Sequence, residues 1–575
     1  MRAHDAEMDP CTAAIVAAAR RRGIPCLRHS EGASLVQLGW GRAARRVHAT
    51  FTSETSHVAV RIARDKPLAR SLLREAGVPV PECVVAATAQ EAVDAARRLG
   101  TPVVVRPFDP RAASDASTAL RSADEVRAAF ERARRHGERA MVEREIAGGA
   151  YRVLVVDGRC VAATRRTPPE VRSDGLRSVR ELVDAENRRR ADGAFRGVHL
   201  ARIPVDEVTE ETIARQGLTL DSVAPAGMAV RLRLRAELSA GAMVEDVTAL
   251  AHREVGAACE RAARAIGLDL AAIDLVCRDI ALPLAAQDGG IVDVNAAPEI
   301  GAGELSPRGD WSRIAEAMVQ ALFPDGRDGR IPLIAVTGGA GATTALLVAH
   351  ALEAAGMRTG VATSGGIRIG NDHLNGGDCT GRAHARALLG SPDVEAAVLE
   401  VAPADLSMSD PAFDRCDVAI LAGPVETALS TLRAREGTAS ALRLLARSAR
   451  ALALDLDHPP CAAAARAADS QVRIVAHSRH AQSPAIAAHI GRGGTAVYLR
   501  RNLIMLAAAG QRIPLMDTDS IDVAGSIAGN GIADVLAASA GLVAFGLEPR
   551  AIAAAFGARP DAVPRRFGRA SHAHP

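Results

Sequence analysis

The sequence predicts a multidomain α/β protein, in which an α+β body is followed by a doubly wound parallel sheet. The chain has 575 residues, which is too long for a single hydrophobic core. Hydrophobic residues make up 48% but aromatic residues only 2%, so cores of Ala, Val, Leu and Ile are expected. Such cores suit helices packed on sheets. Strand-like and helical patterns also alternate through most of the chain.

Residues 1–60 contain a helical run, AAIVAAARRRG, and two strand-like pieces, ASLVQLGWG and RRVHATFTS. We interpret them as a remnant N-terminal segment, too small for a domain of its own. The first residues, MRAHDAEMDP, include no apolar signal stretch, and no run approaches the length of a membrane span. The nine cysteines are scattered without a CxxC pair, which indicates reduced thiols and a cytoplasmic protein.

Residues 61–325 predict the α+β domain. DKPLARSLLREAGVPVPECVVAA and AQEAVDAARRLGTPVVVRPFD each predict a helix followed by a strand. YRVLVVDGRCVAATRRTP predicts a hairpin that turns at Asp157 and Gly158. AIDLVCRDI and GGIVDVNAAP predict further strands.

Residues 326–575 predict the doubly wound domain, after a boundary in the Gly- and Pro-rich stretch FPDGRDGRIP. Six strand patterns alternate there with helical segments: IPLIAVTG, GVATS, EAAVLEVA, CDVAILAG, ARALALDLD and VRIVAHS. This alternation is typical of a parallel sheet covered by helices on both faces.

The stretch AVTGGAGATT has the strand, turn and helix start of a phosphate-binding loop. Gly338 and Gly341 supply the turn, and Thr343 and Thr344 supply hydroxyls. Ala342 stands where such loops carry a lysine that neutralises phosphate. Two interpretations stay open. The turn either binds an anion weakly or is retained only for packing. As regards a role in catalysis, we favour the packing turn.

With its neighbours, this stretch resembles the central domain of Mur ligases and, more closely, the C-terminal half of the cyanophycin synthetase family. The family loop GTNGKTT corresponds to GGAGATT, and GGDCTGRAHARALLGSPDVEAAVLE is similar to the family's GD-TGP…VLE segment. The resemblance places Glu400 at the family's magnesium carboxylate. Gly423 replaces a family Asn, and PRRFGR, near the family's PGRFN motif, lies close to the end. We therefore expect the terminal Mur lobe to be absent and this half to be inactive as a ligase.

The resemblance extends upstream to about Thr12. REIAGGAYRVLVVDGRCVAATRRTPPEVRSDG resembles the family's EEYIPGRDYRLLVV…RR-PA-V-GDG stretch. It implies an ATP-grasp domain over residues 61–325. Such a domain uses ATP and Mg²⁺ to phosphorylate a carboxylate, which an amine then attacks.

The resemblance also implies a metal site. Asp274 matches the first ligand position, Asp293 stands where the family has Glu, and Asn295 keeps the amide. Residues i and i+2 of a strand share a face, so Asp293 and Asn295 are expected side by side. The alternative interpretation is a capped sheet edge.

The basic residues that contact phosphate in the family are altered here but not lost. Lys66, the only lysine of the chain, is retained, and Arg106 replaces the family's phosphate lysine, so both are implied to be catalytic. Glu143 and Arg144 match the hinge that receives adenine. The alternatives are a solvated strand end for Arg106 and an ion pair on a surface strand for Glu143 and Arg144.

Four residues match the family's acceptor-recognition stretch: Arg165, Arg166, Asp174 and Gly175. They imply an amino-acid, dipeptide or polypeptide substrate. An exposed basic hairpin end is the alternative. By resemblance we also expect a homo-oligomer, with a full-length synthetase as a further candidate partner. A net charge of +3 supports neither nucleic-acid nor membrane binding.

Substitutions at other positions are expected to weaken the binding of phosphate. FDPRAASDASTAL replaces a glycine loop yet holds no glycine, Glu237 replaces an Asn, and PEIGAGE replaces PGLRMH. Two hypotheses follow: a ligase whose remaining activity lies in the ATP-grasp half, or a pseudoenzyme that binds polymer or a partner synthetase. A nucleotide sensor that binds ATP without turnover ranks last.

Overall fold

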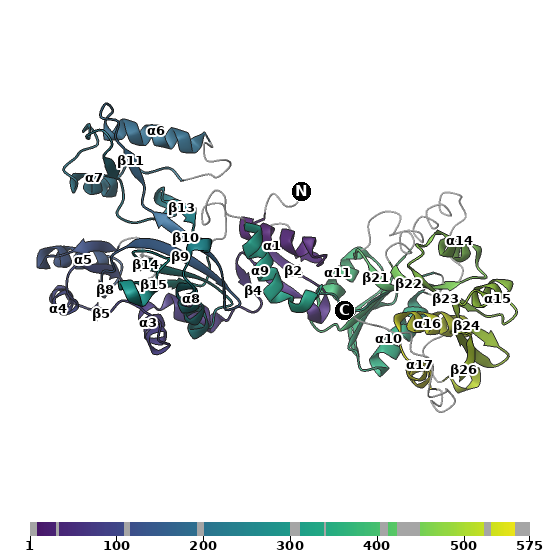
Figure 1. Ribbon diagram of the computed structural model, residues 1–575. Helices are drawn as coiled ribbons and strands as arrows, with labels where there is room; N and C mark the ends of the chain where they lie inside the picture. Colours follow the sequence, from purple (N-terminus) through teal and green to yellow (C-terminus); the bar gives the residue numbers. More distant parts are fainter. Residues whose placement is uncertain are drawn as a thin grey trace. The chain divides into compact units, whose positions relative to one another are not determined.

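The computed structural model describes residues 8–29, 34–108, 116–192, 201–298, 311–338, 341–402, 412–422, 449–521 and 531–557. The chain divides into two compact units (Figure 1). Unit 1 comprises residues 1–22, 28–36 and 45–327, and unit 2 comprises residues 23–27, 37–44 and 328–575. Residues 1–60 therefore contribute to both units. The multidomain α/β class is confirmed, and all nine cysteines are free thiols.

The first elements lead into unit 1. Helix α1 (Pro10–Arg21) is capped by Asp9, whose carboxylate accepts the N–H groups of Cys11 and Thr12. It packs against α9 (Trp311–Leu322). A small sheet follows, with strands in the order β1 (Cys26–Arg28), β2 (Leu35–Leu38), β3 (Arg45–His48) and β4 (Phe51–Thr52). Helices α2 (His57–Arg64) and α3 (Lys66–Glu75) come next.

A four-stranded antiparallel sheet forms the first wall of the site. Its order is β5 (Cys83–Ala86), β8 (Ala140–Arg144), β6 (Val103–Pro107) and β7 (Ser117–Leu120). Helices α4 (Ala89–Leu99) and α5 (Ala123–Arg134) bury their apolar sides against it, around the fully buried Phe130. Helix α5 starts where Ser122 and Glu125 form a reciprocal capping box.

A five-stranded antiparallel sheet forms the second wall. Its order is β13 (Met243–Asp246), β10 (Arg159–Thr167), β9 (Gly149–Val156), β14 (Leu270–Cys277) and β15 (Gly290–Asn295). The predicted hairpin is confirmed, because β9 and β10 join through Asp157 and Gly158, both at positive φ. Helix α8 (Arg253–Ile266) packs its apolar stripe on this sheet.

An insert between β10 and β13 has its own hydrophobic core, which includes Val171, Leu182 and Ile213. It contains β11 (Glu170–Arg172), α6 (Val179–Ala191), α7 (Glu207–Ala214) and β12 (Ala229–Arg231), and Figure 1 draws α6 and β11 in it. Strand β11 pairs with β12 alone.

Unit 2 is built on a sheet with eleven described strands, and its parallel centre is the sheet that the sequence predicted. Its parallel centre has the order β17 (Thr359–Thr363), β20 (Ala396–Glu400), β16 (Leu333–Thr337), β21 (Cys416–Leu421), β22 (Ala449–Asp455), β23 (Arg473–Ser478) and β24 (Thr495–Arg500). Antiparallel strands extend both edges: β18 (Gly366–Ile369), β19 (Asp372–Gly376), β25 (Leu503–Ala508) and β26 (Gln511–Asp517).

Helices cover both faces of this sheet, so it is doubly wound. One face carries α10 (Gly341–Ala354), α16 (Ile532–Phe545) and α17 (Pro549–Ala555). The other carries α11 (Arg382–Gly390) and α14 (Pro459–Ala467). A separate small cluster holds α15 (Pro484–Gly491) through Ile486.

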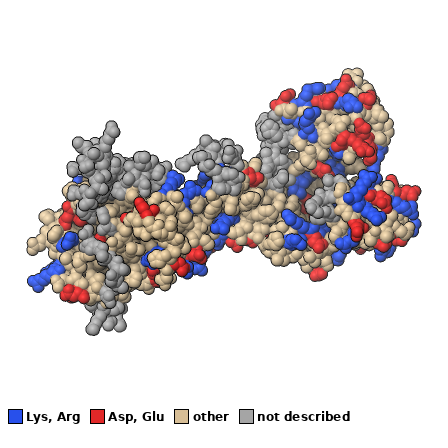
Figure 2. All heavy atoms as spheres, turned by 180° about the vertical axis from the view of Figure 1, so that it is seen from behind, with Lys and Arg blue, Asp and Glu red and all other residues tan. Residues whose placement is uncertain are grey.

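The charged surface is mixed. Basic and acidic side chains are interspersed over the face drawn in Figure 2. Within the described ranges, no helix is both long enough and apolar enough to cross a membrane.

Candidate active site

A cavity of about 1020 Å³ in unit 1 is lined by residues of both sheets described above. Its lining is rich in charge and is basic on balance. Seven arginines face four carboxylates: Arg106, Arg144, Arg152, Arg165, Arg166, Arg231 and Arg235 against Glu143, Glu145, Glu237 and Asp274. A cavity with this balance suits a ligand that carries several negative charges.

Three charged side chains form a row across neighbouring strands of the five-stranded sheet. Arg152 of β9 lies opposite Asp274 of β14, and Asp274 lies opposite Asp293 of β15. Directly opposed residues of an antiparallel pair project from the same face. Asn295 shares that face because it follows Asp293 by two positions. The structure therefore places the three metal ligands predicted in unit 1 on one face, whereas Glu400, the fourth predicted metal ligand, belongs to unit 2.

Arg152 holds Asp274 with two parallel hydrogen bonds. Its Nε donates to Oδ1 at 2.7 Å and its Nη2 to Oδ2 at 2.9 Å. Burial alone would raise the pKa of Asp274. The charge of Arg152 and its hydrogen bonds, helped by the charges of Arg166 and Lys66, instead hold that pKa below its ordinary value. Asp274 is therefore ionised at neutral pH.

Lys66 occupies the first turn of α3 and reaches the same row. Its side chain is only 6% exposed, and Nζ lies 3.4 Å from Asp293 Oδ2. Asp65 starts the helix by accepting the N–H of Leu68 at 3.2 Å, and this cap fixes where Lys66 projects. In the sheet order β15 is an edge strand, and Asp293 pairs with Lys66 there, so the interpretation of a capped sheet edge stays open beside that of a metal site.

Glu143 of β8 is buried between two arginines. Oε2 lies 2.9 Å from Arg106 Nη2, and Oε1 lies 2.9 Å from Arg70 Nη2. Among the described residues, Glu143 Oε1 has no hydrogen-bond partner. Its contact with Arg70 is therefore an ion pair without the geometry of a hydrogen bond. Arg106 is 11% exposed and is therefore not a solvated strand end. Arg144, the next residue, is exposed and lines the cavity.

The predicted acceptor residues are separated. Arg165 and Arg166 both line the cavity, but they alternate along β10. Arg166 projects on the side of Asp274, whereas Arg165 lies opposite Tyr151. Asp174 and Gly175 do not line it: the Asp174 carboxylate accepts the N–H groups of Leu176 and Arg177 in the turn before α6. These hydrogen bonds, foremost that of the Arg177 N–H, hold the pKa of Asp174 below its ordinary value.

The donor set fits magnesium in kind. Two carboxylates and one amide oxygen on a shared face are oxygen ligands of the type that Mg²⁺ takes in proteins. Within the described residues, no group of three or more His, Cys, Asp or Glu side chains could hold a metal ion. Asn295 is therefore needed to complete the set with Asp274 and Asp293.

Of the three departures from the family pattern, two lie partly outside the described residues. Residues 109–115 of the glycine-free stretch, and residues 299–304 of PEIGAGE, lie outside the described residues. Glu237 does line the cavity, and its charge is partly offset because Arg235 Nη1 lies 3.4 Å from its Oε1. Burial lowers the pKa of Arg235, against the opposing charge of Glu237.

Sequence reasoning missed Arg152, Arg70 and Arg235 as site residues. Arg70 is 4% exposed and its Nη2 also donates to the carbonyl oxygen of Val292 at 3.1 Å, so it ties α3 to β15. Arg152 interrupts an otherwise apolar strand in YRVLVV. A charged residue within an apolar strand was the signal that could have identified Arg152 as a site residue, because a buried charge needs a partner of opposite charge.

The structure describes both ends of the altered phosphate turn of unit 2, at Gly338 and Gly341. Gly338 has φ of 128°, and a side chain there would collide with the carbonyl of Ala422, so only glycine fits. Helix α10 begins at Gly341, where an added Cβ would lie 2.8 Å from Glu400 Oε1. Glu400 accepts the N–H and the hydroxyl of Ser364 at 2.6 and 3.0 Å.

The helix start at this turn therefore faces a carboxylate. Thr344 is buried and its hydroxyl has no partner among the described residues, while Thr343 is half-buried. A helix N-terminus attracts anions, and Glu400 already supplies one beside Gly341. With Ala342 in place of a lysine, no cation of the turn offsets it. Gly423, also named from the sequence, lies outside the described residues.

Comparisons with known proteins bear on both units. A family model described as an ATP-grasp domain matches residues 59–153. The cyanophycin synthetase of Nostoc sp. (strain PCC 7120) is 37% identical over 419 residues, which is 72% of this chain and 46% of that protein. The cyanophycin synthetase of Geminocystis herdmanii is 32% identical over 558 residues, 95% of this chain and 63% of that protein.

Among solved structures, a bifunctional glutathione synthetase from Pasteurella multocida matches with 25% identity and a TM-score of 0.43, over 56% of this chain and 45% of that one. The present chain thus spans about half to two thirds of the length of the curated relatives it matches. The match to the second cyanophycin synthetase runs through nearly the whole chain, across the cavity of unit 1 and the doubly wound sheet of unit 2. On this similarity the chain belongs to the cyanophycin synthetase family.

Proposed function

We propose that unit 1 is an ATP-dependent ligase that joins a carboxylate to an amine. The single observation that carries the proposal is the row Arg152, Asp274 and Asp293, with Asn295 beside it, at a cavity that is basic on balance and that Arg152, Asp274 and Asn295 line. We propose the division into a remnant segment 1–60, an ATP-grasp domain 61–325 and a Mur ligase-like domain 326–575.

ATP would supply the phosphoryl group that activates the carboxylate. In this proposal Arg106 and Lys66 contact the phosphates, since Arg106 lines the cavity and Lys66 lies 3.4 Å from Asp293 of the charged row. Asp274, Asp293 and Asn295 hold Mg²⁺. Arg152 is a positioning residue, because its two hydrogen bonds fix the rotamer of Asp274. Glu143 and Arg144 border the place of adenine.

We propose an amino acid, a dipeptide or a polypeptide as substrate. Units of β-aspartyl-arginine or short acidic peptides are the first to test, because Arg165 and Arg166 offer positive charge at the cavity wall. We infer that unit 2 adds no ligase step of its own. The supporting observation is the Glu400 carboxylate beside Gly341, in a turn without lysine.

A pseudoenzyme is the second candidate, and a specific observation favours it. Both carboxylates that would hold magnesium are already bonded to basic side chains, Asp274 to Arg152 and Asp293 to Lys66. A protein that kept these pairs permanently would bind polymer or a partner synthetase, as a homo-oligomer, without turnover.

The test measures ADP release with ATP, Mg²⁺ and a panel of peptide acceptors. The ligase proposal expects release that needs both the metal and an acceptor, and that is lost in Asp293→Ala. Asp184→Ala is the matched control, because Asp184 is an exposed acid of α6 away from the cavity. Absence of release across the panel would favour the pseudoenzyme.

Lys66 offers a second readout that needs no turnover. Because it is the only lysine, an amine-reactive reagent can label just Lys66 and a free chain terminus. The proposal expects ATP with Mg²⁺ to slow labelling at Lys66 and not at the terminus. Equal protection at both, or at neither, would argue against a nucleotide beside Lys66.

A further inference from the structure

Arg70 of helix α3 is buried behind the wall of the candidate active site. Its side chain is 4% exposed and does not line the cavity. Its guanidinium nevertheless contacts three residues that do line the cavity: Pro81, Glu143 and Val292. Arg70 is therefore placed where it can fix the shape of the cavity from outside.

The three partners of Arg70 belong to different parts of the two sheets. Glu143 lies in β8 of the four-stranded sheet, and its Oε1 is 2.9 Å from Arg70 Nη2. The same Nη2 donates to the carbonyl oxygen of Val292, in β15 of the five-stranded sheet, at 3.1 Å. Nη1 donates at 3.4 Å to the carbonyl oxygen of Pro81, two residues before β5. One side chain thus contacts both walls of the cavity.

The backbone joins the two walls at the same place. The N–H of Ile291 in β15 donates to the carbonyl oxygen of Pro79 at 2.8 Å. The N–H of Arg144 in β8 donates to the carbonyl oxygen of Glu82 at 3.0 Å. Residues 79–82 therefore lie between β8 and β15, and Arg70 holds this segment at its centre.

The two walls correspond to the two sides of the proposed nucleotide site. Glu143 borders the place proposed for adenine, and Val292 directly precedes Asp293, a proposed magnesium ligand. ATP must reach both sides at once, whereas adenosine or tripolyphosphate needs only one. Two linked groups bind more tightly than either alone only when the spacing of their sites suits the linkage between them. The spacing of β8 and β15 therefore matters most for ATP.

The charges around Glu143 allow Arg70 to be removed without leaving a buried acid unpaired. Glu143 Oε2 also lies 2.9 Å from Arg106 Nη2. A variant without Arg70 therefore keeps a cation beside this carboxylate, and it avoids the large cost of an uncompensated buried charge. Such a variant loses the connection between the walls and is still expected to fold.

We propose that Arg70 is a positioning residue that sets the spacing between the base side and the phosphate side of the cavity. It acts through Glu143 and through the backbone of β15, and it makes the site selective for a ligand that spans both sides. The inference rests on the proposed function, because it assigns adenine to one wall and the phosphates to the other.

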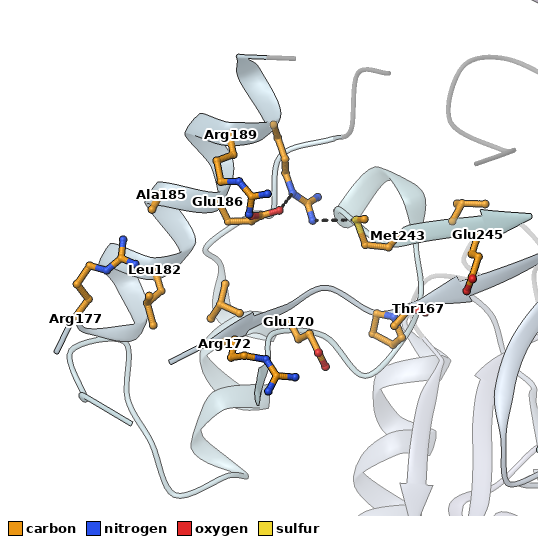
Figure 3. A pocket seen from close by; sticks show the side chains of 14 residues that line it. Thr167, Glu170, Arg172, Arg177, Leu182, Ala185, Glu186, Arg189, Met243 and Glu245 are labelled. Carbon is orange, nitrogen blue, oxygen red and sulfur yellow. Dashed lines mark hydrogen bonds and ion pairs between the residues drawn. The ribbon is translucent and has the colours of Figure 1, made fainter. Parts of the chain in front are cut away.

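A second cavity of unit 1 supplies a matched control. It has a volume of about 650 Å³ and is bordered by α6, β11 and β13 (Figure 3). Arg190 of α6 is 2% exposed and donates to Glu186 Oε1 at 3.1 Å. It also donates to the carbonyl oxygens of Ala201 and Gly241 at 2.8 Å each. Arg190 thus holds one carboxylate and two carbonyl groups, as Arg70 does, but none of them belongs to β8 or β15.

The test is isothermal titration calorimetry on the full chain with three probes: ATP with Mg²⁺, adenosine, and inorganic tripolyphosphate with Mg²⁺. In the wild type we expect ATP to bind about 100-fold more tightly than either of the other two. In Arg70→Met the dissociation constant of ATP should rise roughly 30-fold, whereas those of adenosine and tripolyphosphate should change less than about threefold. Each side of the cavity would remain, but the two would no longer be held at the spacing that ATP needs.

Arg190→Met removes the same kinds of contact elsewhere in unit 1. It should leave the affinity for ATP within about threefold of the wild type, because the walls of the nucleotide site keep their connection. Arg70→Lys is a second variant, in case Arg70→Met does not fold. It keeps a cation beside Glu143 but cannot reach two carbonyl groups with two separate nitrogens, so we expect ATP to bind about tenfold more weakly.

The outcomes separate the role of Arg70 from the proposed function. A wild-type preference for ATP that persists in folded Arg70→Lys and Arg70→Met would overturn the role of Arg70 and leave the proposed function standing. Equal weakening of all three probes, or an equal loss of ATP binding in Arg190→Met, would show that Arg70 only supports the fold. A wild type that binds ATP no more tightly than tripolyphosphate would refute both proposals.

Discussion

The acidic side chains of the candidate active site are held by basic partners one by one. Arg152 bonds Asp274, Lys66 lies near Asp293, and Arg106 bonds Glu143. Removing one member of such a buried pair leaves a charge without compensation, which is costly. Each pair is therefore a point where a single substitution has a measurable effect.

Arg152→Gln should destabilise the protein by about 3 kcal/mol at pH 7, because the ionised Asp274 loses its partner. In the variant, burial would raise the pKa of Asp274, whereas in the wild type Arg152 holds it below 3.8. In the variant, the Asp274 carboxylate takes up a proton as the pH falls. The loss of stability caused by the substitution should therefore become smaller toward pH 4. Urea unfolding at pH 7 and pH 4 measures it.

Arg180→Gln serves as the control for this substitution. Arg180 is about half exposed and pairs with the exposed Asp221, so the change should stay within about 0.5 kcal/mol. A loss for Arg152→Gln that is no larger than for Arg180→Gln would contradict a supporting role for Arg152.

A second residue-scale prediction concerns Asp534 of α16. The residue is 2% exposed, its Oδ2 has no partner among the described residues, and burial raises its pKa to about 6. A raised pKa means that the folded state favours the protonated form. The contribution of Asp534 to stability is therefore most favourable below about pH 4 and is lost as the pH rises from there to about 6.

Asp534→Asn should consequently stabilise the protein at pH 8, by on the order of 1–3 kcal/mol, and have little effect at pH 4. Thermal melts at the two pH values measure the difference. Asp393→Asn, an exposed acid of the same unit, is the control. Equal effects at both pH values would show that Asp534 is ionised alike in the folded and unfolded chain.

At the scale of elements, helix α6 depends on Arg190 more than on its own amphipathicity. The guanidinium ties the helix to Gly241 and Ala201, while Ser178 and Glu181 fix its first turn. Arg190→Met keeps the side-chain volume but leaves the buried carbonyl of Gly241 and the partly buried carbonyl of Ala201 without their donor. We expect the loss of these hydrogen bonds to lower the free energy that holds α6 in place by about 3 kcal/mol.

We expect the amides of α6 to exchange hydrogen about 100-fold faster in Arg190→Met, since a factor of ten corresponds to about 1.4 kcal/mol. Hydrogen exchange followed by mass spectrometry locates the effect. Arg188→Met, at an exposed position on the same helix, should leave exchange unchanged. Similar exchange in both variants would mean that packing alone holds α6.

At the scale of the whole molecule, we expect the two units to differ in nucleotide binding. ATP with Mg²⁺ at one hundred times its dissociation constant should stabilise the protein by about 2.7 kcal/mol. Asp293→Ala in unit 1 should abolish that gain, whereas Thr344→Ala in unit 2 should retain it. A melting series with and without nucleotide tests the assignment, and loss of the gain in Thr344→Ala would reverse it.

Much of this architecture could be predicted from the sequence. Strand-like and helical patterns alternated clearly enough to predict the doubly wound sheet, and the Asp157–Gly158 turn predicted the hairpin of β9 and β10. Asp293 and Asn295 were expected on one face because strand alternation is a local rule. These features depend on neighbours in the chain, so local residue patterns were sufficient.

Only the tertiary structure decided which charges meet. Arg152 and Asp274 are far apart in the chain and touch because β9 and β14 pair in one register. The sequence by itself determined the residue types and the order of the elements. Pair formation depends on register and distance across strands, and residue order alone carries neither.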